Sequence, residues 1–197
     1  HTAAHDLRAP LRKIAQRASM LCDSAGSRLD EESKHSLDRI RENVKDMERL
    51  IEGLLDYARM EDAPGEQRLI DLSHSVRQAI SNLQPIIDET RAILTVGPLP
   101  CVRGNEIALV SLFQNLIGNA LKFCVDTPRV EIRTVALEGK FVVSVRDEGI
   151  GIDESDLERI FKPFARAVGK HRFEGCGLGL ATCARIVAAH GATISAG

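Results

Sequence analysis

The segment LDRIRENVKDMERLIEGLLDYA, residues 37–58, carries a seven-residue apolar repeat. Its apolar side chains recur at alternating intervals of three and four, at Leu37, Ile40, Val44, Met47, Ile51, Leu54 and Ala58. This spacing lays one apolar stripe along a helix and is typical of helices that pack side by side. The segment therefore predicts a long helix that needs a helical partner.

An earlier segment supplies that partner, because the same alternation runs through Ala4, Leu7, Leu11, Ile14, Ala18 and Leu21. Residues 24–27 read SAGS and predict a turn. Asp30 is placed to cap the second helix, where Glu31 and Glu32 suit the positive end of the helix dipole. We therefore expect a helical hairpin over residues 1–61. Its uncovered apolar face predicts a four-helix bundle with a second copy, and the alternative is a monomer in which the hairpin packs against the rest of the chain.

Beyond a predicted linker at residues 62–70, helical and strand patterns alternate. Ser73 is the expected cap of a first helix, and Asn105 is the expected cap of a second helix that runs to about Phe123. The remaining expected elements are strands at 92–96, 130–133 and 141–145 and a helix at 178–190. Residues 71–197 are thus expected to form an α+β two-layer sandwich, one sheet covered by helices.

Composition limits the classes of function. The chain has 197 residues, is 44% apolar and 27% charged, and has a formal net charge of −2, which gives no case for nucleic acid or an anionic membrane surface. No apolar run approaches the roughly 20 residues that cross a bilayer. The five cysteines form no CxxC pair, so neither a zinc site nor a disulfide framework is predicted, and a cytoplasmic location is expected.

His5 is the first candidate for chemistry. It follows the stripe position Ala4, so we expect it to face water, and Asp6 is its neighbour in the sequence. An imidazole beside a carboxylate can be held neutral with one nucleophilic nitrogen. Pro10 removes a helical hydrogen bond nearby, in the turn beside the reactive side chain. The alternative is an ordinary surface histidine.

Three further groups of residues suit an anionic ligand. Asn115, Asn119 and Lys122 share one helix face, which fits phosphate with a hard cation. Asp147 ends a strand and is followed by glycines at 149 and 151. GCGLGL, residues 175–180, opens a helix, and a basic stretch precedes it that predicts a lid over something negatively charged. The alternatives are a solvated polar face, an ordinary turn and a solvated loop.

In this order the segments HDLRAPL, NLIGNALKF, DEGIGI, IFKPF and GCGLGL resemble the catalytic core of sensor histidine kinases of two-component systems. The resemblance covers nearly the whole chain. It implies a dimerisation and phosphotransfer hairpin followed by an ATP-binding sandwich of the histidine kinase and gyrase ATPase type. It also implies a transferase that uses ATP and Mg²⁺, acts as a homodimer and passes phosphate to the receiver domain of a response regulator.

The resemblance also implies roles for particular residues. His5 is expected to be the phosphorylated nucleophile, Asp6 its acid–base partner and Asn119 the Mg²⁺ ligand. Asp147 is expected to hold the adenine amino group, and Phe161 and Phe164 to anchor the lid. The remaining residues expected to contact nucleotide are Asn115, Lys122, Phe123, Gly149, Gly151, Arg166, Gly175, Gly177, Leu178 and Gly179.

Three alternative functions stay open at this point. A histidine phosphotransfer protein would relay phosphate without binding ATP. An ATPase of the same superfamily would use nucleotide as a conformational switch, with His5 incidental. A dimeric scaffold would have no nucleotide affinity. The intact asparagine and glycine segments favour the kinase.

Overall fold

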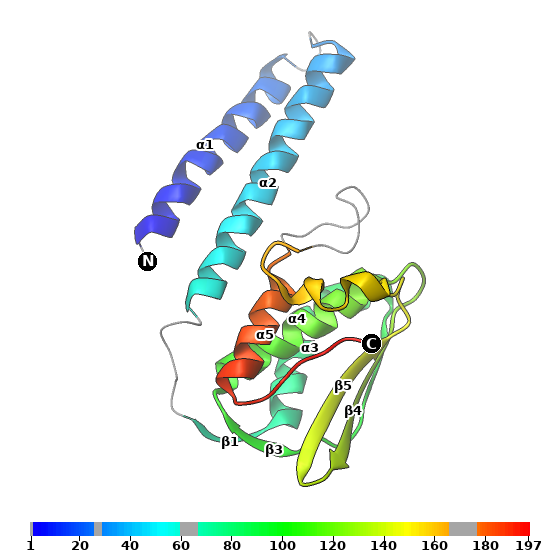
Figure 1. Cartoon of the computed structure of the whole chain (residues 1–197). Helices are drawn as coiled ribbons and strands as arrows, with labels where there is room; N and C mark the ends of the chain where they lie inside the picture. Colours follow the sequence, from blue (N-terminus) through cyan, green and yellow to red (C-terminus); the bar gives the residue numbers. More distant parts are fainter. Residues whose placement is uncertain (1, 26–28, 60–66, 166–176) are drawn as a thin grey trace. The chain divides into compact units, whose positions relative to one another are not determined.

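A computed structural model of the chain describes residues 2–25, 29–59, 67–165 and 177–197 (Figure 1). The chain divides into two compact units, His1–Arg59 and Met60–Gly197. Within the described ranges, every helix is too short or too polar to span a bilayer.

The first unit is a hairpin of two helices, α1 (Thr2–Ala25) and α2 (Glu31–Arg59). The expected cap of α2 is confirmed, because the backbone N–H of Ser33 donates to Asp30 Oδ1 at 2.8 Å. Hydrogen bonds from Ser33 lower the pKa of Asp30. The two predicted apolar stripes therefore belong to two helices that pack against each other.

The apolar repeat of the hairpin divides into a covered and an uncovered half. Ala18 and Val44 are buried between the helices, each 4% exposed. The alternate positions of the repeat, which lie three residues further along, stay exposed at Ile14, Leu21, Ile40, Met47 and Leu54. One hairpin thus leaves half of its repeat in contact with water.

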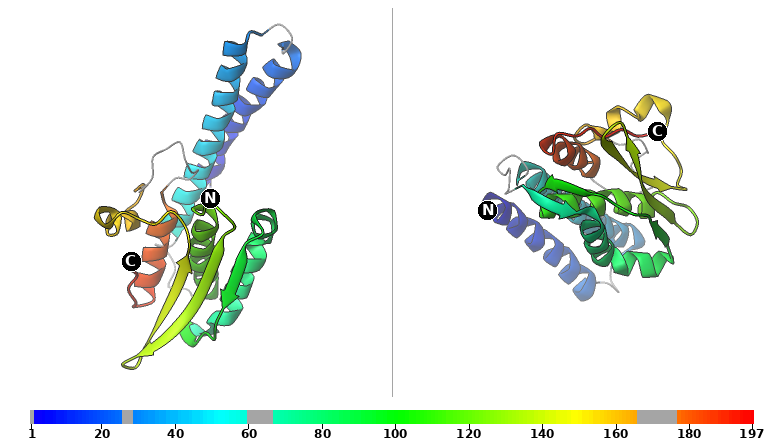
Figure 2. Two further views of the ribbon diagram at one scale, coloured as in Figure 1. Left: turned by 90° about the vertical axis from the view of Figure 1, so that its right-hand side faces the viewer. Right: turned by 90° about the horizontal axis from the view of Figure 1, so that it is seen from below.

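The second unit has two small sheets beside a layer of helices (Figures 1 and 2). Strand β1 (Arg68–Asp71) pairs antiparallel with β3 (Cys101–Gly104). The larger sheet has the order β2 (Ile93–Val96), β4 (Arg129–Leu137), β5 (Lys140–Asp147), with β2 parallel and β5 antiparallel to β4. The helices are α3 (Leu72–Thr90), α4 (Glu106–Lys122) and α5 (Gly179–Ala189), with the 3₁₀ turns η1 (Glu154–Asp156) and η2 (Arg159–Phe161).

The core lies where the helices meet the larger sheet. Val76 of α3, Ile117 of α4 and Ile132 of β4 are fully buried there. Helix α4 contacts α3, α5 and strands β4 and β5, so it is the central element of the unit. This confirms the predicted fold class of a helical hairpin followed by an α+β domain. The expectation of one sheet was wrong, because β1 and β3 pair with each other in a second, two-stranded sheet.

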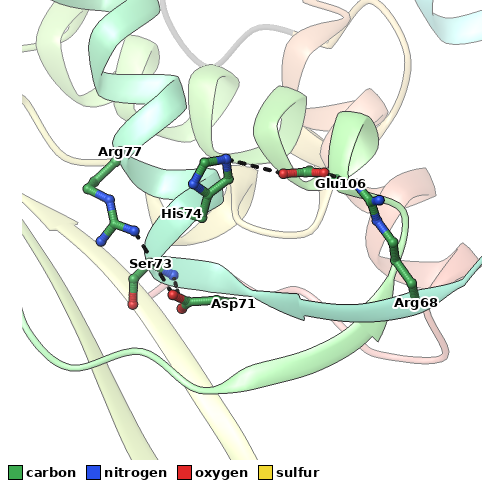
Figure 3. A network of polar contacts seen from close by, with 6 residues as sticks. All are labelled: Arg68, Asp71, Ser73, His74, Arg77 and Glu106. Carbon is green, nitrogen blue, oxygen red and sulfur yellow. Dashed lines mark hydrogen bonds and ion pairs between the residues drawn. The ribbon is translucent and has the colours of Figure 1, made fainter.

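The sequence predicted the wrong cap for α3. The cap is Asp71, whose Oδ1 accepts the backbone N–H of Ser73 at 2.8 Å (Figure 3). The reason is that β1 runs directly into α3, which leaves no separate turn in which Ser73 could act. The strand also occupies residues 68–70, which the sequence analysis assigned to the linker.

The same small region carries a cluster of exposed ionic contacts (Figure 3). Arg68 pairs with Glu106 at the start of α4, and His74 Nε2 lies 3.3 Å from Glu106 Oε1. Since exposed pairs of this kind contribute little free energy, the burial of the adjoining apolar residues carries most of the stability here.

Candidate active site

Asn115, one residue of the predicted polar face of α4, lies against the start of α5. The Asn115 side chain is fixed by a hydrogen bond from its Nδ2 to the carbonyl oxygen of Ser111, at 2.9 Å. Its Oδ1 lies against Gly179, where an added Cβ would be only 2.8 Å away. The structure therefore brings together Asn115 and Gly179, two residues that are far apart in the sequence.

The end of α4 is joined to the loop after β5. The backbone N–H of Ile150 donates to the carbonyl oxygen of Phe123 at 3.0 Å, and the N–H of Gly149 donates to Asp147 Oδ1 at 2.9 Å. A Cβ on Gly149 would lie 2.6 Å from Asp147 Oδ1 and 2.8 Å from the Phe123 carbonyl oxygen. Because no side chain fits there, glycine lets the Asp147 loop dock against the end of α4.

A third contact joins Phe164 to Gly177. The N–H of Phe164 donates to the carbonyl oxygen of Gly177 at 2.9 Å. Gly177 has a φ of +72°, and an added Cβ would lie 2.6 Å from the Ala165 carbonyl oxygen. Phe164 itself has a left-handed φ of 63° and an exposed ring, whereas Phe161 in η2 is half-buried.

The other predicted ligand residues differ in how they are placed. Lys122 Nζ lies 4.5 Å from the centre of the Phe123 ring, a cation–π contact at the end of the polar face. Gly151 is exposed with a φ of +70°. The Leu178 side chain is 1% exposed and belongs to the core, so only its backbone can meet a ligand. Asn119 is half-buried on α4.

Four predicted residues lie, in whole or in their side chains, outside the part of the chain that the structure describes. Arg166 and Gly175 lie outside the described residues. His5 and Asp6 belong to α1, but their side chains are not among those described.

One well-fixed residue was missed by the sequence analysis. The imidazole of His190, just after α5, accepts a hydrogen bond from the backbone N–H of Asn105 at 3.0 Å. A histidine that ends a helix is a weak sequence signal, because it can equally serve the helix dipole from the surface. Asn105 was correctly predicted as the cap of α4, since its Oδ1 accepts the N–H of Ala108 at 3.0 Å.

These residues fit a nucleotide with a hard cation. Amide oxygens such as those of Asn115 and Asn119 are donors that Mg²⁺ accepts, and phosphate oxygens complete such a shell. Nowhere in the described ranges do three His, Cys, Asp or Glu side chains form a metal cluster. The glycines at 149, 177 and 179 keep side chains out of the places where loops approach α4 and η2.

Comparison with known families accounts for both units. Residues 1–63 match the His Kinase A (phospho-acceptor) domain, and residues 104–197 match the histidine kinase-, DNA gyrase B- and HSP90-like ATPases. The chain therefore belongs to the sensor histidine kinases, a class of enzymes in two-component signalling.

Among individual proteins, the chain is similar to the phytochrome-like protein Cph1 of Synechocystis, with 35% identity over 96% of the chain and 26% of Cph1. Cyanobacterial phytochrome A of Nostoc is 35% identical over 96% of the chain and 25% of that protein. The chain thus spans about a quarter of these relatives. Full-length ShkA, solved in complex with AMPPNP, superposes with a TM-score of 0.68 and 28% identity, covering 100% of this chain and 42% of ShkA.

Proposed function

We propose that this chain is the kinase core of a two-component sensor, which phosphorylates His5 from ATP and passes the phosphoryl group to an aspartate of a response regulator. The observation that supports this most is that one chain contains both a phosphoacceptor hairpin and an ATPase-family domain. A phosphotransfer protein that does not bind ATP has no need of the second domain.

In this proposal the ATP site is built around α4. Asn119 holds Mg²⁺, while Asn115 and Lys122 contact the phosphates. Asp147 accepts a hydrogen bond from the adenine amino group, and Gly149 and Gly151 line the adenine pocket. The residues that complete the site are Phe123, Phe164, Arg166, Gly175, Gly177, Leu178 through its backbone, and Gly179. Bound Mg²⁺ offsets negative charge on the phosphates.

The chemistry assigned to α1 is a nucleophilic attack. The unprotonated ring nitrogen of His5 attacks the γ-phosphorus in line, a P–N bond forms, and the bond to the β–γ bridging oxygen breaks so that ADP leaves. Asp6 orients the imidazole and takes up its remaining proton. An aspartate carboxylate of the regulator then attacks the same phosphorus and releases His5.

We also propose that the hairpin works as a homodimer. Half of its apolar repeat is exposed in one chain, at Ile14, Leu21, Ile40, Met47 and Leu54. A second hairpin can cover these positions in a four-helix bundle. The domain division that goes with this is a phosphotransfer hairpin that ends near residue 61 and a catalytic domain that begins with β1. Because ATP and receiver domains are cytoplasmic, we place this portion in the cytoplasm.

Labelling with γ-³²P-ATP and Mg²⁺ tests the kinase proposal. The wild-type chain is expected to become labelled, and the label is expected to be lost in acid and kept in alkali, as for phosphohistidine. His5→Gln is expected to bind ATP and take up no label. Asn119→Asp is expected neither to bind ATP nor to become labelled. A label that survives in His5→Gln would overturn the assignment of His5.

A further inference from the structure

Helices α4 and α5 lie side by side and run in opposite directions (Figures 1 and 2). Contacts are spread along the whole pair. At one end, Asn105 before α4 meets His190 after α5. At the other end, Asn115 of α4 meets Gly179 at the start of α5. The second contact belongs to the proposed ATP site, and the first lies at the far end of the same helix pair.

The middle of the pair has a weaker contact. Cys183 Sγ lies 3.8 Å from the carbonyl oxygen of Leu112. Burial raises the pKa of the Cys183 thiol to about 12, so the thiol stays protonated and can donate. Because thiols are weak donors, this contact alone fixes the two helices poorly along their common axis.

His190 makes a directional contact between the end of α5 and the cap of α4. Its Nδ1 lies 2.7 Å from the carbonyl oxygen of Ile186 in α5, and its Nε2 lies 3.0 Å from the backbone nitrogen of Asn105. A carbonyl only accepts and a backbone N–H only donates. The ring therefore carries its proton on Nδ1, and both of its nitrogens are used at once.

The surroundings leave the ring little freedom to move. A Cβ on the buried Gly104 of β3 would lie 2.5 Å from His190 Cδ2 and 2.7 Å from His190 Nε2. The ring thus packs directly on the backbone of Gly104, one residue before the cap of α4. This close approach sets the distance between the end of α5 and the start of α4.

We propose that His190 is a positioning residue for the ATP site: it fixes α5 along α4 and thereby holds Gly177 and Gly179 at the correct distance from Asn115. The inference rests on the proposed function, because it assigns these glycines to phosphate binding. His190 acts through the helix and does not touch nucleotide.

Two substitutions at this position distinguish the effect of the ring's shape from the effect of its hydrogen bonds. His190→Phe keeps a planar ring and loses both bonds, whereas His190→Gln keeps a donor and an acceptor on one amide. Val76→Ala is the control, because it removes two buried methyl groups from α3 and lowers stability without touching the α4–α5 contact.

The measurement is the affinity of the full chain for AMPPNP with Mg²⁺, by isothermal titration calorimetry well below the unfolding temperature. His190→Phe is expected to bind about tenfold more weakly, the size expected for losing the one bond, to the Asn105 N–H, that joins the two helices. His190→Gln is expected to recover at least half of that loss on a logarithmic scale, and Val76→Ala to bind as the wild type does. Equal binding by His190→Phe and wild type, or no recovery in His190→Gln, overturns the inference alone. A wild type that does not bind overturns the proposed function as well.

Gly104→Ala decides the matter if His190→Phe does not fold. Its methyl group pushes on the same ring from β3, so AMPPNP binding is expected to weaken in the same direction. Unchanged binding by a folded Gly104→Ala chain contradicts the positioning role.

Discussion

Among single residues, Gly179 is the one whose missing side chain makes room for the amide oxygen of Asn115. Its backbone is helical, so alanine would fit its conformation, but a Cβ would lie 2.8 Å from Asn115 Oδ1. We expect Gly179→Ala to displace the Asn115 amide and to weaken ATP binding about tenfold or more, with little loss of stability. Calorimetric titration and thermal unfolding measure the two effects.

Gly118 provides the matched control on α4. A Cβ there would meet only Leu83 Cδ2, at 3.9 Å, which is ordinary van der Waals contact. Gly118→Ala is expected to keep the ATP affinity and to stabilise α4 by up to about 1 kcal/mol, because alanine is the better helix former. Equal loss of affinity in both variants would show that Gly179 has no special relation to Asn115.

Ser75 is a residue whose hydroxyl is costly to bury. It is fully buried in α3, and its Oγ has no hydrogen-bond partner within the described ranges. A buried hydroxyl without a partner costs roughly 1–3 kcal/mol. We therefore expect Ser75→Ala to raise the free energy of unfolding in urea by about 1 kcal/mol more than Ser81→Ala, which changes an exposed serine of the same helix. A Ser75→Ala chain that is less stable than wild type contradicts this.

Site residues could be predicted from the sequence where the residue type and its spacing indicate the chemistry. Asn115, Asn119 and Lys122 stood out because they share one helix face, and the structure adds the proximity of Asn115 to Gly179. His190 could not be found in the same way. Its role depends on Asn105 and on the missing side chain of Gly104, both distant in the sequence.

At the element scale, helix α3 begins with a cap that titrates. Hydrogen bonds from Ser73 lower the pKa of Asp71, and the charges of Arg77 and His74 act in the same direction. The folded state therefore favours the carboxylate. Its contribution to stability is fully present above the usual aspartate value of 3.8 and is lost as the pH falls through the lower folded value.

Asp71→Asn tests this cap. The amide keeps an oxygen for the Ser73 N–H and does not titrate, so the variant is expected to lose less stability than wild type between pH 5 and pH 3. Urea unfolding at both pH values measures the difference, with pH 7 as the reference. Parallel losses in the two proteins would assign the acid sensitivity to other groups.

The long elements followed from the sequence, whereas strands β1 and β3 did not. Helices α1, α2 and α4 have apolar repeats over many turns, which outweigh any single residue. Strands β1 and β3 have four residues each and owe their existence to pairing with each other, at Leu69 with Arg103 and Ile70 with Val102. Pairing between distant segments has no local sequence signal.

At the scale of the whole molecule, the exposed half of the hairpin repeat predicts self-association. Met47 is 50% exposed at the middle of that half. Met47→Glu places a charge in the proposed bundle core, so we expect the chain to become monomeric. Sedimentation equilibrium measures the mass, and Glu42→Lys on the exposed side of α2 is the control that stays dimeric. A monomeric wild type contradicts the four-helix bundle.

The repeat predicted both helices of the hairpin, but not which of its residues are buried within one chain and which stay exposed. Ala18 and Val44 pack inside one chain, whereas Leu21 and Met47, three residues later, do not. Ala18 and Val44 share one of the two alternating positions of the repeat, and Leu21 and Met47 share the other. The repeat alone does not say which of the two positions the partner helix of the same chain covers. The dimer proposal rests on this difference.

Both halves of a phosphotransfer reaction, the phosphoacceptor His5 and the ATP site, are proposed to belong to this one chain. Mass spectrometry at neutral pH after incubation with ATP and Mg²⁺ tests this proposal most directly. We expect one added phosphoryl group, localised by fragmentation to His5 and absent when Asn119 is replaced by aspartate. A wild-type chain that binds ATP and remains unmodified, or that carries the phosphoryl group on another residue, would contradict it.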